Sequence, residues 1–457
     1  MKHLNRTIII IMFTFLLLPF LTTIKAEAAT QNDYVKVGLK FGSSSVASCT
    51  IKTDDGFILG TAEGRSFIEG MPLPAYTKLV ISNESGAIVI RDENGTLLSS
   101  DLGSYGCIMS ADYADDGILY FEETPYRDGI MFVAKTDGTI TVINYITLEH
   151  YIYGVLNSEL HYTNPIEALK AQAVAARSFG ELNLGKHSAD GFDLCTGTHC
   201  QVYKGYSCEY PSTVEATDDT EGEMIYSEGK PVTAFYYKNS GGYTQNSEDV
   251  WTYRHPYLRS VKDEYSPSYP WSTSLSFDTI KQKLDGAGYN TGTIQSIAIK
   301  GRNSTGAVCD LQIVGSNSTV TLQKEKIRNV LGSTIIKSLI FQLGDSYIEG
   351  AAGSSAWKIS SGIKTESPGN NLYIVSGNGT VTKTERDAIF GSNGLSTVPL
   401  GGGTTGSEIA TGETATFSGY GYGHGVGMPQ DSAVEMAKQG FTYDEILKYY
   451  FTDIELN

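Results

Sequence analysis

The strongest constraint on the fold is a change in hydrophobic period at Thr147. Before this residue, short apolar runs alternate with two-residue turn signals, which are Asp55-Gly56, Asn94-Gly95 and Asp137-Gly138. Such pairs between apolar runs are typical of β-hairpins. After Thr147 the apolar residues recur at helical spacing. The sequence therefore predicts an α+β chain that begins with a β-rich N-terminal region at 33–146.

The remainder of the 457 residues exceeds the usual size of one domain. We expect a mixed α+β region at 147–344, with a helix at 277–284, that continues at 413–457 with two short helices. Between these parts, residues 345–412 are rich in Gly, Ser and Thr, which indicates a loop-rich insertion with one hairpin at Asn378-Gly379.

The first predicted helix presents a carboxylate on its apolar face. Thr147 is in the N-cap position, and one helical face holds Leu148, Ile152, Val155 and Glu159. A carboxylate on a stripe that faces the core is partly desolvated, and burial raises its pKa toward the range of a general acid. The alternative is a structural glutamate that is held by the backbone or by Arg177.

A second helix follows directly. Asn164 is predicted as its N-cap, Pro165 as its first residue and Glu167 as part of its cap, and the helix runs on to Leu182.

The N-terminus resembles an export signal. Lys2 and Arg6 precede an apolar run at 8–20, and Ala26-Glu27-Ala28 supplies small residues at cleavage spacing. We expect residues 1–28 to be removed and the protein to be secreted or bound to the cell wall. The alternative is an uncleaved anchor on the outer face of the membrane.

The net charge limits the classes of partner that the chain can bind, and the cysteines indicate either a metal site or a disulfide. A net charge of -17 disfavours nucleic acid, whose phosphates need a basic surface. The chain has six cysteines, and three fall between Cys195 and Cys208, where His199 separates Cys195 from Cys200 and His187 lies upstream. Two Cys and two His suit tetrahedral zinc, whereas an exported chain also permits a disulfide from Cys200 to Cys195 or Cys208.

Residues 419–427 carry glycine at every second position. In an extended conformation one face is bare, so a ligand or another backbone can approach it, while Tyr422 and His424 line the opposite face. Tight packing is the alternative. Ser240-Gly241-Gly242 indicates a turn that can expose a hydroxyl to a substrate.

Taken together, these segments resemble the SpoIID sporulation protein family and its LytB-like relatives. The matching stretches occur in the family's order and are Leu148-Glu-His-Tyr-Ile-Tyr-Gly-Val-Leu-Asn-Ser-Glu159, Ala168-Leu-Lys-Ala-Gln-Ala-Val-Ala-Ala-Arg177, Gln201-Val-Tyr203, Ser240-Gly-Gly-Tyr-Thr244, Asp249-Val-Trp251, Pro256-Tyr-Leu-Arg259 and Gly423-His-Gly-Val-Gly-Met428. The chain departs from the family at Pro429, where Ser is more usual, and in the length of the insertion.

The resemblance implies a peptidoglycan lytic transglycosylase with Glu159 as its catalytic residue. It suggests substrate contacts by Gln201, Ser240, Tyr422 and His424. It also implies a structural zinc, held by His187, Cys195, His199 and Cys200.

The expected substrate is a glycan strand without stem peptides, cleaved between N-acetylmuramic acid and N-acetylglucosamine to leave 1,6-anhydro ends. A hydrolase would need a second carboxylate, for which Asp249 is the candidate. A non-catalytic wall-binding protein that enhances a partner amidase is the other alternative. A membrane is a partner only if the leader is retained.

Overall fold

The computed structural model describes residues 33–344 except Asp116, four short strands between 359 and 384, and residues 409–457. The predicted leader at 1–28 lies outside the described residues. Strands and helices are both abundant, and the strands dominate the N-terminal region, so the predicted α+β class is confirmed. No helix in the described part of the chain has the length and apolar character needed to span a membrane.

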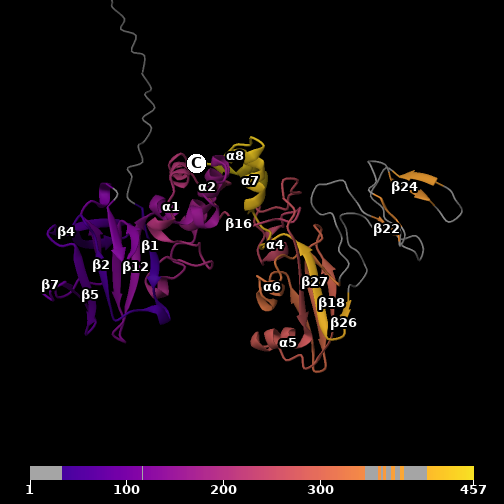
Figure 1. Ribbon diagram of the computed structural model, residues 1–457, viewed down its shortest axis with the longest axis horizontal. Coiled ribbons are helices and arrows are strands. Elements are labelled where there is room, and N and C mark those ends of the chain that lie inside the picture. Colours follow the sequence, from indigo (N-terminus) through magenta and orange to yellow (C-terminus); the bar gives the residue numbers. More distant parts are fainter. Residues whose placement is uncertain are drawn as a thin grey trace, which may run out of the picture.

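The N-terminal region is a sandwich of two sheets (Figure 1). The first sheet has the order β13-β1-β12-β11-β8-β3-β4 and consists of β1 (Tyr34–Lys40), β3 (Phe57–Glu63), β4 (Ser66–Leu73), β8 (Gly106–Ser110), β11 (Gly129–Ala134), β12 (Ile140–Thr147) and β13 (Leu194–Cys195). The second has the order β10-β9-β2-β5-β6-β7 and consists of β2 (Ser48–Lys52), β5 (Lys78–Glu84), β6 (Ala87–Asp92), β7 (Leu97–Ser99), β9 (Ile118–Phe121) and β10 (Thr124–Arg127).

Two of the three predicted hairpins are confirmed. Asn94-Gly95 joins the antiparallel strands β6 and β7, and Asp137-Gly138 joins β11 and β12. The hairpin at Asp55-Gly56 is wrong, because β2 and β3 lie in different sheets. Ile51 before this turn and Phe57 after it are both buried in the core between the sheets, so the chain crosses the sandwich there.

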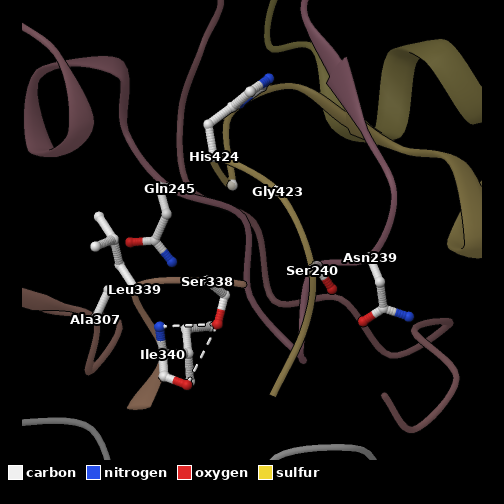
Figure 2. Close-up of a pocket in the computed structure, with 10 residues that line it drawn as sticks. Asn239, Ser240, Gln245, Ala307, Ser338, Leu339, Ile340, Gly423 and His424 are labelled. Atoms are coloured by element: carbon white, nitrogen blue, oxygen red, sulfur yellow. Dashed lines mark hydrogen bonds between the residues drawn. The ribbon is translucent and has the colours of Figure 1, made fainter. Parts of the chain in front are cut away.

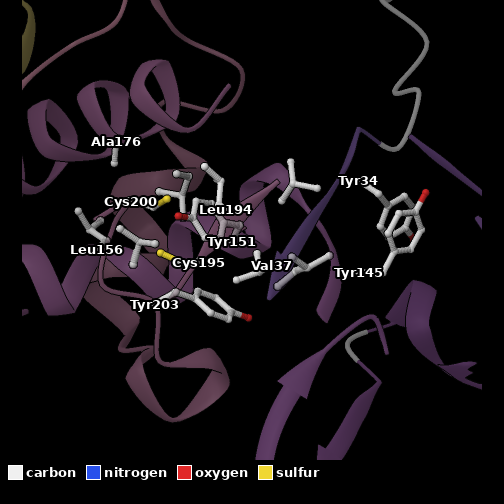
Figure 3. Packing of buried hydrophobic residues seen from close by; sticks show 14 of the residues in the cluster. Tyr34, Val37, Tyr145, Tyr151, Leu156, Ala176, Leu194, Cys195, Cys200 and Tyr203 are labelled. Atoms are coloured by element: carbon white, nitrogen blue, oxygen red, sulfur yellow. The ribbon is translucent and has the colours of Figure 1, made fainter. Parts of the chain in front are cut away.

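The central strands of the first sheet are buried on both faces, whereas the edge strand β4 is mostly exposed, and the second face of the sheet carries the helices. Strand β12 is buried along nearly its whole length and leads directly into α1 (Leu148–Glu159). The Thr147 hydroxyl accepts a hydrogen bond from the His150 N–H at 3.4 Å, which confirms the predicted N-cap. Cys195 and Cys200 lie beside Tyr151 in the hydrophobic cluster between this sheet and the helices (Figure 3).

Helix α2 (Ile166–Leu182) packs against α1, and its N-cap is Pro165 rather than Asn164. The predicted cap is wrong because the Asn164 amide donates to the His161 carbonyl instead. Glu167 accepts a hydrogen bond from the N–H of Tyr443, the first residue of the C-terminal helix α8 (Tyr443–Tyr450), at 2.8 Å. Glu167 therefore caps a helix that is distant in sequence.

The remaining elements around α2 close this middle part of the molecule. They are α3 (Pro211–Asp218), α4 (Ser247–Val250), α7 (Gln430–Lys438), β14 (Ile225–Ser227), β15 (Lys230–Pro231), β16 (Tyr236–Tyr237), β28 (Met428–Pro429) and β29 (Glu455–Leu456). Strand β16 pairs in parallel with β28, so the C-terminal segment joins the body at the end of the glycine-rich segment 419–427.

A second β module, with its own hydrophobic core, lies between the two halves of the middle part in sequence (Figure 1). It consists of β17 (Pro270–Ser276), α5 (Phe277–Gly286), β18 (Ile294–Arg302), β19 (Val308–Gly315), β20 (Thr319–Gln323), α6 (Lys326–Leu331), β21 (Phe341–Leu343), β26 (Ile409–Thr411) and β27 (Thr414–Tyr420). Helix α5 confirms the predicted helix at 277–284. The predicted region 147–344 thus contributes to more than one core.

Within the predicted insertion, β22 (Ile359–Ser361) pairs with β23 (Lys364–Glu366), and β24 (Leu372–Val375) pairs with β25 (Val381–Thr384). The second pair flanks the predicted hairpin at Asn378-Gly379, whose own residues lie outside the described part. The end of the insertion includes β26, which pairs with β18 of the second module.

Candidate active site and metal centre

Glu159 is the last residue of α1 and is half-buried. Its Oε1 accepts a hydrogen bond from the Val202 N–H at 3.1 Å, and its carbonyl accepts one from the Gln430 amide at 3.0 Å. Burial raises the pKa of this carboxyl above its ordinary value, and the hydrogen bonds from Val202 and Gln430 only partly oppose that. The side chain is thus biased toward the protonated form that a general acid needs.

In the described part of the chain, neither a cation nor a second carboxylate contributes to the pKa shift of Glu159. Arg177, the alternative partner considered from the sequence, pairs instead with Glu149, at 2.8 and 2.6 Å. Asp249, the candidate second carboxylate, accepts a hydrogen bond from the Asn246 amide. The geometry therefore favours single-carboxylate chemistry at Glu159.

Gln201 holds a tyrosine hydroxyl beside this carboxylate. The Gln201 amide donates to the Tyr236 hydroxyl at 2.9 Å and to the Ala176 carbonyl, while its oxygen accepts from Tyr151. Burial, and after it the charge of Glu159, raises the pKa of Tyr236. Gln201 is 1% exposed and its amide is fully engaged, so it positions Tyr236 rather than offering a free group to substrate.

His187, Cys195, His199 and Cys200, here called the Cys/His cluster, hold their ligand atoms within 4.8 Å of one another. His187 Nε2 lies 3.2 Å from His199 Nδ1 and 3.5 Å from Cys200 Sγ. His199 Nδ1 lies 3.7 Å from Cys200 Sγ and 3.9 Å from Cys195 Sγ. Usual zinc bond lengths give tetrahedral edges of about 3.3 Å between nitrogens and about 3.6 Å between nitrogen and sulfur, so the four donors fit a zinc ion.

The alternatives to this ligand set do not match the geometry. All six cysteine thiols are free, so Cys200 forms no disulfide with Cys195 or Cys208. The Cys208 sulfur lies 3.1 Å from the Ser158 hydroxyl and 3.5 Å from the Asn157 amide, against α1. His187 rather than Cys208 therefore completes the set of four candidate donors, and its Nδ1 lies 4.0 Å from Asp190.

The glycine-rich segment is packed against backbone. A Cβ on Gly421 would lie 2.9 Å from the Asn239 carbonyl, and one on Gly427 would lie 2.1 Å from the Phe235 carbonyl. Residues 421–427 are not extended, because Gly421, Gly423, Gly425 and Gly427 all have positive φ, and other parts of the chain rather than a ligand lie against Gly421 and Gly427. The alternation is a packing requirement that leaves Tyr422 half-exposed.

His424 is enclosed by aromatic rings. Its ring centroid lies 5.2 Å from those of Tyr237 and Trp251, and its Nδ1 accepts a hydrogen bond from Val426 N–H at 3.1 Å. Burial, with the nearby charge of Arg328, lowers the pKa of His424 to about 3. His424 is therefore neutral near pH 7 and fixes the segment around it.

Ser240 is buried, and its hydroxyl is engaged in hydrogen bonds. Its hydroxyl donates to Asp263 at 2.6 Å and accepts from the Gly242 N–H at 3.1 Å. Asp263 is shared with Ser432 and Tyr450, so Ser240 anchors the loop. Together with His424 and Gly423, it lines a small cavity whose other side is formed by Ser338, Leu339 and Ile340 of the second module (Figure 2).

Sequence reasoning missed three residues that act on the site, namely Val202, Tyr236 and Gln430. Val202 contributes only a backbone N–H, which no side-chain pattern reveals. Tyr236 and Gln430 lie in separate segments that approach Glu159 through the pairing of β16 with β28. The one sequence feature that pointed to any of them is the position of Val202 within the matching stretch Gln201-Val-Tyr203.

The chain is similar to known proteins over the segment that contains these residues. Residues 136–226 match the family model described as "Stage II sporulation protein" (SpoIID), and residues 259–361 match a domain of unknown function, DUF8618. An amidase enhancer of Bacillus subtilis is 30% identical over 298 residues, which cover 65% of this chain and 39% of that protein. Stage II sporulation protein D of Bacillus subtilis is 27% identical over 330 residues, which cover 68% of this chain and 75% of the relative.

Proposed function

Because the chain carries a SpoIID family domain, we propose that it is an exported peptidoglycan lytic transglycosylase with Glu159 as its single acid/base residue. The observation that carries the proposal is the setting of Glu159, a half-buried carboxyl with a raised pKa on which neither a cation nor a second carboxylate of the described residues acts. The proposed substrate is a glycan strand from which an amidase has removed the stem peptides.

In the proposed reaction, protonated Glu159 donates its proton to the oxygen that links C1 of N-acetylmuramic acid to N-acetylglucosamine. The bond from C1 to that oxygen breaks as positive charge develops at C1. The ionised carboxylate then takes the proton of the muramoyl 6-hydroxyl, whose oxygen bonds to C1. The proton returns to Glu159, no water is consumed, and one carboxylate serves both steps, unlike the pair that ordinary glycosidases require.

The Val202 N–H and the Tyr236 hydroxyl can each form hydrogen bonds that assist the proposed proton transfers of Glu159. The N–H bonded to Oε1 stabilises the ionised form after proton donation. Tyr236 accepts the hydrogen bond from Gln201, so its own proton remains available for a hydrogen bond to substrate or to the carboxylate.

We propose that the Cys/His cluster holds a structural zinc ion. With four protein donors it would leave no open position for substrate, and its contribution would be to fold stability. Cys200 is two residues from Val202, whose N–H contacts Glu159. The metal would thus fix the segment that orients the catalytic carboxyl.

The similarity to an amidase enhancer supports a second candidate, a wall-binding protein that stimulates a partner amidase. One experiment separates the possibilities. Purified glycan strands without peptides are incubated with the chain, and the products are analysed by mass spectrometry.

Muramoyl ends lighter by one water than hydrolytic ends would support the transglycosylase. Reducing ends of full mass would indicate a hydrolase. Intact strands, together with faster peptide release when an amidase is added, would favour the enhancer.

A further inference from the structure

Two tyrosines and a lysine meet where the second module joins the glycine-rich segment. The Lys337 ammonium lies 5.4 Å from the ring centroid of Tyr269 and 5.8 Å from that of Tyr422. The two rings are 6.0 Å apart and inclined by 37°. All three residues are half-buried, so each keeps part of its surface available.

The backbone fixes this arrangement on both sides of Tyr422. The Gly421 N–H donates to the Tyr269 carbonyl and the Gly423 N–H donates to the Lys337 carbonyl, each at 2.9 Å. The Tyr422 N–H donates to the Asn239 carbonyl at 2.8 Å. Both glycines have positive φ, 84° and 132°, which a residue with a side chain rarely adopts. The three side chains are thus held together before any ligand arrives.

Side-chain hydrogen bonds connect this group to the C-terminal end of α1, where Glu159 lies. The Asn239 amide donates to Asp431 at 3.0 Å. The preceding residue, Gln430, donates to the Glu159 carbonyl. The Tyr269, Lys337 and Tyr422 group is therefore built into the wall that also supports the proposed acid.

Lys337 has no ion pair or hydrogen bond from its ammonium within the part of the chain that the structure describes. Neighbouring Lys238, in contrast, pairs with Asp431 at 2.7 Å. Among the described residues, the cation at Lys337 lies over the faces of two aromatic rings, which stabilise positive charge without neutralising it. It remains available to an anionic ligand.

We propose that Tyr269, Lys337 and Tyr422 form a subsite for N-acetylmuramic acid in which Lys337 pairs with the free lactyl carboxylate. Tyrosine rings suit the apolar face of a sugar, and their hydroxyls suit its polar edge. This inference rests on the proposed function and refines its substrate. The lactyl carboxylate is free only after the stem peptide, which is joined to it by an amide bond, has been removed. The subsite therefore selects strands on which an amidase has already acted.

Binding to the full chain carrying Glu159→Gln, which prevents turnover, tests the proposal by calorimetry. The first probe is a peptide-free glycan strand, and the second is an N-acetylglucosamine oligomer of equal length, which has no lactyl group. Lys337→Met keeps the apolar stem and removes the charge. Lys326→Met is the matched control, since Lys326 lies 5.2 Å above the ring of Tyr289 in the same module.

Lys337→Met should weaken binding of the peptide-free strand about tenfold, the scale of one hydrogen bond to a charged group, and leave binding of the oligomer unchanged. Lys326→Met should change neither affinity. Equal affinity of the Lys337→Met and parent proteins for the peptide-free strand, or an equal loss for both probes, would overturn the subsite. Mass spectrometry of the strand recovered after the titration shows whether it was cut. Cleavage by the Glu159→Gln chain would count against Glu159 as the catalyst, whereas unchanged binding by Lys337→Met would count against the subsite, so the two failures are distinguishable.

Discussion

The two ends of α1 hold glutamates in opposite electrostatic settings. At the N-terminal end, Glu149 forms two hydrogen bonds with Arg177, which is 1% exposed. At the C-terminal end, Glu159 accepts hydrogen bonds from neutral donors, the Val202 N–H and the Gln430 amide, and burial raises its pKa. The helix dipole adds to the contrast, since it favours negative charge at the first turn and disfavours it at the last. One helix thus holds a carboxylate in an ion pair at one end and the proposed proton donor at the other.

The role of each carboxylate depends on whether a cation pairs with it. Glu149 supplies the charge that compensates buried Arg177. Glu159 is held by neutral groups, so its proton can leave and return without breaking an ion pair. Perturbing each end separately should therefore give different losses, in stability at one end and in turnover at the other.

Removing the proposed zinc should have the largest effect, because structural zinc sites contribute folding free energy directly. We expect chelation to lower the free energy of unfolding by at least several kcal/mol and to abolish turnover, since Cys200 leads to Val202 and thus to Glu159. Elemental analysis and thermal unfolding with and without chelator measure this. Metal-free protein of unchanged melting temperature, or a mapped disulfide between Cys195 and Cys200, would contradict it.

Substitution at the N-terminal end of α1 should have an intermediate effect. Glu149→Gln leaves the buried guanidinium of Arg177 without its anion and should cost about 2 kcal/mol, the scale of hydrogen bonds to charged groups. Turnover per folded molecule should persist. Urea unfolding and product release, both measured at a temperature where the variant is folded, check the two statements. A variant with wild-type stability but no turnover would reverse the roles of the two glutamates.

The smallest expected effect is a pH dependence of stability that comes from Glu159. Its pKa is higher in the folded than in the unfolded state, so the folded state binds more protons. Its contribution to stability is therefore present below the unfolded pKa and is lost as pH rises through the folded pKa. Glu159→Gln should remove this loss and be at least as stable as the wild type near pH 7. Urea unfolding at several pH values measures the difference, and parallel curves for the two proteins would count against a raised pKa.

The sequence predicted the parts of the site that lie within one segment. Thr147 as a cap and the helical spacing up to Glu159 determined where α1 begins and which side chain ends it. The Cys/His cluster spans only residues 187–200, so its members were found together. The sequence suggested Arg177 as a partner for Glu159, but the helix directs it toward Glu149.

What the sequence could not predict depends on contacts between distant segments. The Val202 N–H reaches Glu159 across 43 positions, and Glu167 caps α8 across 276. Hydrophobic patterns likewise gave no sign that residues 270–344 form a core with residues 409–420, because periodicity identifies strands and not their partners. Gln201 and Ser240 matched the family, but their burial became visible only in the fold.

The most direct test of the central claim compares wild type with Glu159→Gln in the release of anhydromuramoyl ends from peptide-free glycan strands. Glutamine keeps the shape of the side chain but cannot transfer a proton, so the rate should fall by roughly 10²- to 10⁴-fold for each proton transfer, with the melting temperature unchanged or higher. Glu167→Gln is the control, because this residue caps α8 and should affect stability more than turnover. Release at near the wild-type rate by a Glu159→Gln protein of unchanged melting temperature would contradict the assignment.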